Sequence, residues 1–149
     1  MDGVAVNGTY YLRSWDPTSR EETGHQVSSV EEVAKAADLI GEAYRRAEVS
    51  YLPGLALWRG IEEPENSLSV GIAPDGWAIV HTNDEFFQVV THGSHERDGV
   101  RRSVQLDDFL EIPTVCFIDK DLALETVAHW MATGELLPSA GFSDDLFSC

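Results

Sequence analysis

The sequence has few cysteines, few basic residues and no long apolar run, and each shortage excludes a class of protein. Its only cysteines, Cys116 and Cys149, lie in an apolar run and at the last position, so we expect two reduced thiols in a cytoplasmic protein, not a disulfide framework. No apolar run approaches the roughly 20 residues that a membrane-spanning helix requires. The N-terminus has an early acid, Asp2, and no basic stretch before an apolar one, so we expect no signal peptide.

Basic residues are scarce: ten lysines and arginines against 26 aspartates and glutamates give a formal net charge of −16. Most of the imbalance lies in residues 61–149, which carry seventeen acids and four bases, whereas residues 1–60 carry nine acids and six bases. Such a surface repels nucleic acid, whose phosphates need a basic footprint. It attracts basic proteins and accelerates their association. The alternative interpretation is that the acidity serves solubility alone.

Cap and turn signals predict two helices. Ser29 and Glu32 form a capping box, and apolar residues recur behind it every three or four positions, so we predict a helix that begins there and ends before Pro53. A second helix is predicted to begin at Asp119 or Asp121. Gly134 is placed to close it in the left-handed conformation.

Short runs rich in β-branched and aromatic residues predict strands. They cover residues 9–15, 55–59, 67–72, 77–81, 86–91 and 102–106, with a loop at 16–24, an edge strand within 137–142 and a frayed tail at 143–149. The tight turn Pro74-Asp75-Gly76 predicts a hairpin. With 149 residues, 43% of them hydrophobic, the chain is expected to form a single domain, 1–149. We predict an α+β fold: one antiparallel sheet of about five or six strands with two main helices packed against it.

Candidates for chemistry are few. The best metal candidate is the region of His81, His92 and His95 with nearby Glu96 and Asp98, but it lies in a loop without cysteine support, and a solvated polar loop is the simpler interpretation. A nucleophilic pair of Cys116 and His129 would require a buried apolar cysteine to be reactive. No glycine-rich loop of the phosphate-binding type is present. We therefore expect no enzymatic activity, no metal and no cofactor.

Two stretches carry a family resemblance. The first is Leu68-Ser-Val-Gly-Ile72, a Pro-Asp-Gly turn and Trp77-Ala-Ile-Val-His81; the second runs from Ile112-Pro113 through a helix ending in Thr133-Gly134 to Pro138. Together they resemble immunity protein family 1 of bacterial polymorphic toxin systems, and the helix–strand order of residues 29–59 fits it too. Members often finish with a tryptophan-bearing strand, and here the equivalent stretch is Ser139-Ala-Gly-Phe142, a departure that bears on the last strand.

The resemblance implies a cytoplasmic antidote that binds a cognate secreted toxin domain in a 1:1 complex. Toxins paired with this family often look like nucleic-acid deaminases, whose cleft must attract phosphate. Carboxylates can occupy such a cleft, and the candidate partner contacts are Glu62, Glu63, Glu65, Asp84, Glu85, Asp107, Asp108 and Glu111. Each of them is also interpretable as a solvated surface acid. The alternatives are a small metal- or ligand-binding domain or enzyme that uses His81, His92 and His95, and a scaffold domain in a larger complex.

Overall fold

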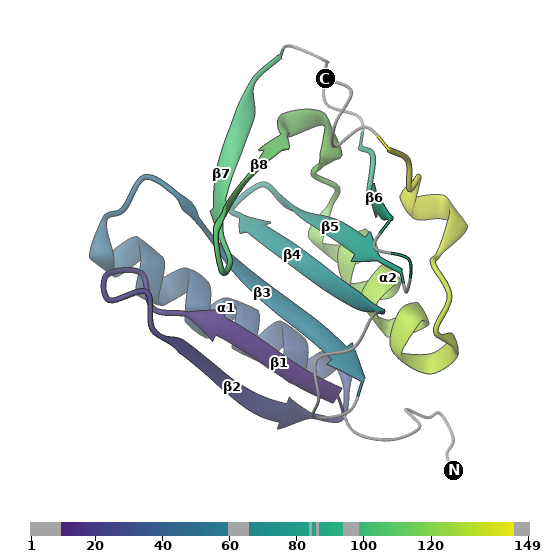
Figure 1. Ribbon diagram of the computed structural model, residues 1–149, viewed down its shortest axis with the longest axis horizontal. Coiled ribbons are helices and arrows are strands. Elements are labelled where there is room, and N and C mark those ends of the chain that lie inside the picture. Colours follow the sequence, from purple (N-terminus) through teal and green to yellow (C-terminus); the bar gives the residue numbers. More distant parts are fainter. Residues whose placement is uncertain (1–9, 60–65, 84, 86, 94–98, 145–149) are drawn as a thin grey trace.

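The computed structural model describes residues 10–59, 66–83, 85, 87–93 and 99–144 (Figure 1). In chain order the elements are β1 (Tyr10–Trp15), β2 (Glu22–Val27), α1 (Val30–Ala47), β3 (Leu52–Arg59), β4 (Ser67–Ala73), β5 (Gly76–Thr82), β6 (Gln88–Val90), β7 (Arg101–Gln105), β8 (Phe109–Pro113) and α2 (Lys120–Thr133). Two 3₁₀ turns, Thr114–Cys116 and Pro138–Ala140, lie on either side of α2.

The described residues form one sheet of eight strands. Six of them follow the order β2-β1-β3-β4-β5-β6, and all neighbours in this row are antiparallel. The β7–β8 hairpin joins the row through a short parallel pairing of β7 with β3. The predicted α+β fold with a single, mostly antiparallel sheet is confirmed, as is the hairpin across Pro74-Asp75-Gly76.

The strand β2 corrects the prediction of a loop at residues 16–24. All its residues are exposed except Val27, so β2 lacks the alternation of apolar and polar residues that marks a half-buried strand. Its pairing comes from the neighbouring strand: Tyr11 lies against Gly24, where an added Cβ would overlap the tyrosine ring. An edge strand with only one buried side chain has no recognisable pattern of apolar residues, so it cannot be predicted from such a pattern.

Helix α1 begins and ends as predicted. The Ser29 hydroxyl accepts the N–H of Glu32 at 3.3 Å, and the Glu32 carboxylate accepts the N–H and the hydroxyl of Ser28 at 2.5 and 2.9 Å. These bonds from Ser28 hold the pKa of Glu32 below its ordinary value. The return contact of the capping box therefore reaches Ser28 and not Ser29. At the other end Glu48 adopts the left-handed conformation, with φ of 56°.

The end of α2 follows the prediction, but the tail does not. Gly134 is left-handed, with φ of 78°, and donates its N–H to Trp130 at 2.7 Å. The edge strand predicted within 137–142 is wrong: Pro138–Ala140 forms a 3₁₀ turn, and only Ser143 bridges to Val90. A proline without an N–H, at the first turn position, favours this local helix over a strand. Of the tail predicted to be frayed, residues 145–149 lie outside the described ranges.

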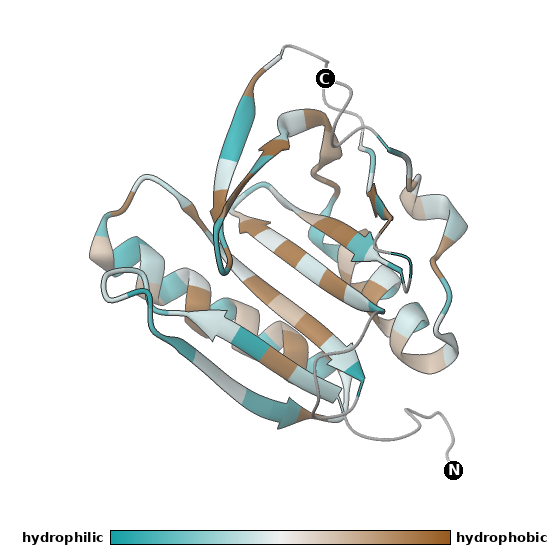
Figure 2. Ribbon diagram, in the orientation of Figure 1, coloured by the Kyte–Doolittle hydropathy of each residue, from teal (hydrophilic) through white to brown (hydrophobic). Residues whose placement is uncertain are grey.

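The core lies on both faces of the sheet. Both helices cover one face (Figure 1), where Leu12, Leu57, Leu68 and Ile79 are fully buried. A second cluster, which includes Val80, Val104, Ile112, Cys116 and Phe117, lies beneath the β7–β8 hairpin. Apolar and polar residues alternate along β4 (Figure 2). The four tryptophans are all buried.

Two glycines give opposite predictions for stability. Gly41 lies inside α1, and a Cβ added there would meet nothing within 4 Å. Because alanine is the better helix former, Gly41→Ala should raise the free energy of unfolding by about 1 kcal/mol. A Cβ at Gly93 would overlap the carbonyl oxygen of Phe117, so Gly93→Ala should destabilise. Urea unfolding followed by circular dichroism measures both; a destabilised Gly41→Ala variant would contradict this account of α1.

Candidate protein-interaction surface

The β7–β8 hairpin stands on the face of the sheet opposite both helices (Figure 1). Its turn end is fixed to the sheet, because Leu52 and Pro53 pair with Val104 and Gln105, the last residues of β7, and Val104 is buried in the second core cluster. Beyond the pairing lies a tight turn, in which the N–H of Leu106 donates to the carbonyl of Asp108 at 3.1 Å. The turn therefore presents Asp107 and Asp108 from a rigid support.

Aromatic contacts brace this turn from a second side. The ring of Phe109 packs edge-on against Tyr51, with 4.9 Å between centroids, and the guanidinium carbon of Arg20 lies 4.8 Å from the Phe109 centroid. Arg20 belongs to the β1–β2 connection and has a φ of 64°. Phe109 remains 37% exposed. The turn is thus held between β3 and the β1–β2 connection, with part of an aromatic ring open to a partner.

A buried hydroxyl ties the end of β7 to the rest of the fold. The Tyr44 hydroxyl donates to the carbonyl of Trp15 at 2.7 Å and lies 3.1 Å from Oε1 of Gln105. Burial raises the pKa of Tyr44 far above its ordinary value, so the proton that makes these bonds stays in place. Gln105, only 2% exposed, gains a partner that a buried amide requires.

The charged side chains of the hairpin differ in their contacts between the turn and the strands. Asp107 and Asp108 are exposed and make no ion pair with any described residue. Farther from the turn, the Glu111 carboxylate accepts the hydroxyl of Ser103. On β7, the Arg102 guanidinium donates two hydrogen bonds, of 2.8 and 3.0 Å, to the carboxylate of Asp75. Arg102, farther from the turn, is thus matched by a carboxylate, whereas Asp107 and Asp108 at the turn form no ion pair with a described residue.

The structure brings together three of the eight predicted partner contacts. Asp107, Asp108 and Glu111 share the hairpin and are all exposed. Glu85 is exposed between β5 and β6, where its N–H donates to Asn83 at 2.9 Å. The remaining four, Glu62, Glu63, Glu65 and Asp84, lie outside the described residues. Phe109 and Arg20 were missed, because their contact joins segments almost 90 positions apart and leaves no local signal.

The histidine candidates do not form a site in the described residues. His81 Nε2 lies 2.7 Å from Oδ1 of Asn66, which also accepts the indole N–H of Trp130 at 3.3 Å. His92 is half-buried, and its N–H donates to Ala140 at 3.1 Å; His95, Glu96 and Asp98 are not described. Within the described ranges, no three His, Cys, Asp or Glu residues lie close enough to hold a metal ion.

The proposed nucleophilic pair is not assembled either. Cys116 is fully buried in the core beneath the β7–β8 hairpin, and its carbonyl accepts the hydroxyl of Thr91 at 2.7 Å. His129 lies on α2, which covers the opposite face of the sheet (Figure 1). The sheet separates the two side chains, so Cys116 acts as the small buried hydrophobe of the alternative interpretation.

A groove of about 540 Å³ lies between α1 and the ends of β3 and β4. Its floor is apolar and includes Ala37, Leu52 and Ile72, and its rim carries Asp38, Glu42, Arg45 and Lys120. These rim charges are paired, with Lys120 Nζ at 3.1 Å from Asp38 and Arg45 on Glu42. No histidine or cysteine lines it, so this groove lacks the side chains proposed for an enzyme.

The comparisons with known proteins give no relative: no family model, no curated protein and no solved structure matches the chain. Among the described residues, neither helix combines the length and the apolar character needed to cross a membrane.

His81 gives a prediction for pH. Its burial lowers the pKa below the ordinary value of 6.5, so the unfolded chain binds a proton more readily than the folded protein does. The contribution of His81 to the free energy of unfolding is therefore fully present above pH 6.5, the ordinary pKa. It is lost as the pH drops from there toward the lower pKa of the folded protein. His81→Gln, which keeps a donor for Asn66, should lose less unfolding free energy between about pH 7.5 and about pH 5.5 than the unaltered protein.

Chemical denaturation at the two pH values measures the difference. His25→Gln, at an exposed position of β2, is the control for removing a histidine. An unchanged pH dependence in His81→Gln would show that His81 does not titrate as its burial requires.

Proposed function

We propose that the chain is an immunity protein that binds a basic toxin domain and blocks its substrate cleft without doing chemistry itself. The observation that carries the proposal is the pair of exposed, uncompensated carboxylates, Asp107 and Asp108, on a braced hairpin in a chain of net charge −16. The family resemblance of the sequence supplies the class of partner.

In this proposal the hairpin turn enters the cleft in which the toxin would otherwise hold phosphates. Two adjacent carboxylates offer negative oxygens to the lysine and arginine side chains that bind a nucleic-acid backbone. Phe109, partly exposed beside them, adds apolar contact area at the edge of the same surface. The partner would be a secreted toxin of the nucleic-acid deaminase type, bound in the cytoplasm with one toxin domain per chain. No cofactor takes part.

The decisive experiment is to look for a toxin domain encoded by a neighbouring gene and to co-express it with this chain. Cells should be rescued and a complex with one toxin domain per chain should co-purify. Rescue without a complex would contradict inhibition by binding, and a complex that leaves the toxin active would contradict coverage of its cleft.

The hairpin makes a sharper kinetic prediction. Asp107→Asn/Asp108→Asn removes two exposed charges that bond to no other side chain in the described residues, so the fold should keep its stability. The association rate with the toxin domain at low salt should fall about tenfold, and its dependence on salt should flatten. Stopped-flow mixing at several salt concentrations measures both.

Glu125→Gln/Glu135→Gln is the matched control, because it removes the same charge from exposed positions on and after α2. If both double variants slow association equally, net charge alone is responsible and the hairpin has no special part.

A further inference from the structure

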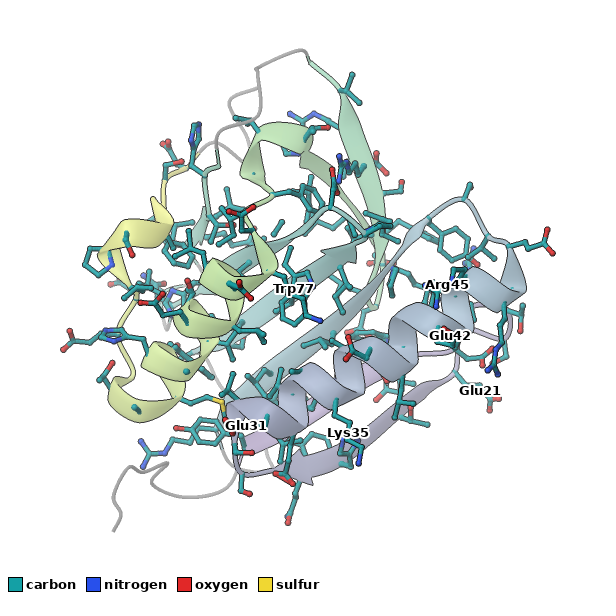
Figure 3. All side chains as sticks on the ribbon, turned by 180° about the vertical axis from the view of Figure 1, so that it is seen from behind. Glu21, Glu31, Lys35, Glu42, Arg45 and Trp77 are labelled. Carbon is teal, nitrogen blue, oxygen red and sulfur yellow. The ribbon has the colours of Figure 1, made fainter. Side chains whose placement is uncertain are left out.

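Helix α1 carries an unusual pattern on its solvent face. Residues spaced by three and four positions share one face of a helix, and the outward stripe of α1 consists of Glu31, Lys35, Leu39, Glu42 and Arg46. It lies opposite the buried stripe that includes Val33, Ala37 and Tyr44. Glu31, Lys35 and Glu42 follow one another along the outside of the helix (Figure 3).

Leu39 is out of place on this polar stripe. It is 66% exposed, although the helix otherwise separates its apolar and polar faces. It also borders a second groove, of about 330 Å³, between α1 and the β1–β2 hairpin. The first groove follows the other side of the same helix. The middle of α1 is therefore a ridge with an exposed leucine on top and a hollow on each side.

The charges along the ridge are ordered so that an antiparallel copy of the helix would place opposite charges against each other. In chain order the signs are negative at Glu31, positive at Lys35, negative at Glu42 and positive at Arg46. Along the chain, the midpoint between Glu31 and Arg46 falls between Asp38 and Leu39. The midpoint between Lys35 and Glu42 falls at the same place. When a second α1 is laid antiparallel about that midpoint, Glu31 faces Arg46, Lys35 faces Glu42, and the two Leu39 side chains meet at the centre.

The same face is electrically neutral, in a chain of net charge −16. Its acids Glu31 and Glu42 are balanced by Lys35 and Arg46. Within the chain Glu42 pairs with Arg45 and Arg46, and Asp38 beside the stripe pairs with Lys120. Two copies of a strongly acidic protein repel each other through surfaces with excess carboxylates. A neutral face with alternating signs lets them approach, and it penalises registers that place unpaired like charges together. The two Asp38 carboxylates lie beside the midpoint, and each is paired with Lys120 of its own chain.

We propose that α1 is a self-association surface on which a second copy of this chain packs antiparallel, in an isologous contact centred on Leu39. The 18 residues of α1 give a helix about 27 Å long, and the two hollows accept side chains of the partner ridge. A contact of one helix on each side is small, so the dimer should form at micromolar concentrations and not at nanomolar ones. The β7–β8 hairpin lies on the opposite face of the sheet and stays free, so dimerisation is independent of toxin binding.

Charge reversal within one pair of residues tests the arrangement. In Lys35→Glu, the introduced carboxylate would face the carboxylate of Glu42 twice per dimer, and in Glu42→Lys, the introduced ammonium would face the ammonium of Lys35 twice. Each single variant should therefore dimerise about tenfold more weakly than the unaltered chain. The double variant Lys35→Glu/Glu42→Lys restores both attractions and should dimerise within about threefold of it. An equimolar mixture of the two single variants should form a heterodimer more readily than either forms a homodimer, because both of its cross-pairs are attractive.

Sedimentation velocity on the full chain alone, from about 5 to about 500 µM, measures these constants without any toxin. Arg59→Glu, at an exposed position at the end of β3, makes the same change of net charge away from α1 and should leave dimerisation nearly unchanged. Leu39→Asn should weaken it, and circular dichroism checks that α1 is intact in every variant.

The proposal is overturned if the unaltered chain stays monomeric across this range. It is also overturned if Arg59→Glu weakens the dimer as much as Lys35→Glu, or if the mixture forms no heterodimer. None of these outcomes bears on the toxin-binding function, which the co-expression experiment tests separately.

Discussion

The Tyr44 hydroxyl is the contact on which the arrangement of the fold depends. It connects helix α1 to the end of β1 through the Trp15 carbonyl and to the end of β7 through Gln105. Both side chains are buried, and a buried polar group left without a partner costs about 1–3 kcal/mol. The relative placement of the helix, the sheet and the turn end of the hairpin that the structure shows satisfies this network. The rigid presentation of the β7–β8 turn begins at that junction.

Segments with strong local signals were predictable from the sequence. The capping box at Ser29 and Glu32 marked the start of α1, and Gly134 marked the end of α2, because caps depend on a few neighbouring residues. β2 was not predictable, since its only buried residue is Val27 and its pairing partner decides its conformation. The tail was mispredicted although Pro138 favours a local turn, because the strand prediction rested on apolar residues such as Ala140, and these are buried in the core cluster that includes residues of α2 and not in a strand.

The candidate surface was predictable only in its composition. Asp107 and Asp108 are recognisable as acids that follow the strand predicted at 102–106, but β8, which follows them, was not predicted. Their rigid presentation depends on Arg20, Tyr44 and Tyr51, which reach the hairpin from elsewhere in the chain. The same limit applies to the rejected pair. Cys116 and His129 are close in sequence, and only the topology places a sheet between them.

Net charge and charge order act over different distances, and the two proposed surfaces differ in this respect. At physiological salt an exposed charge is screened beyond about 8 Å, so an excess of exposed charge without an ion pair, as at Asp107 and Asp108, acts on a partner only at short range. On α1 the alternating signs cancel beyond a few ångströms and act only once two helices are in contact. An uncompensated pair therefore influences the rate of an encounter, whereas an ordered, neutral stripe determines its alignment. A chain of −16 needs the second arrangement wherever it is to meet a copy of itself.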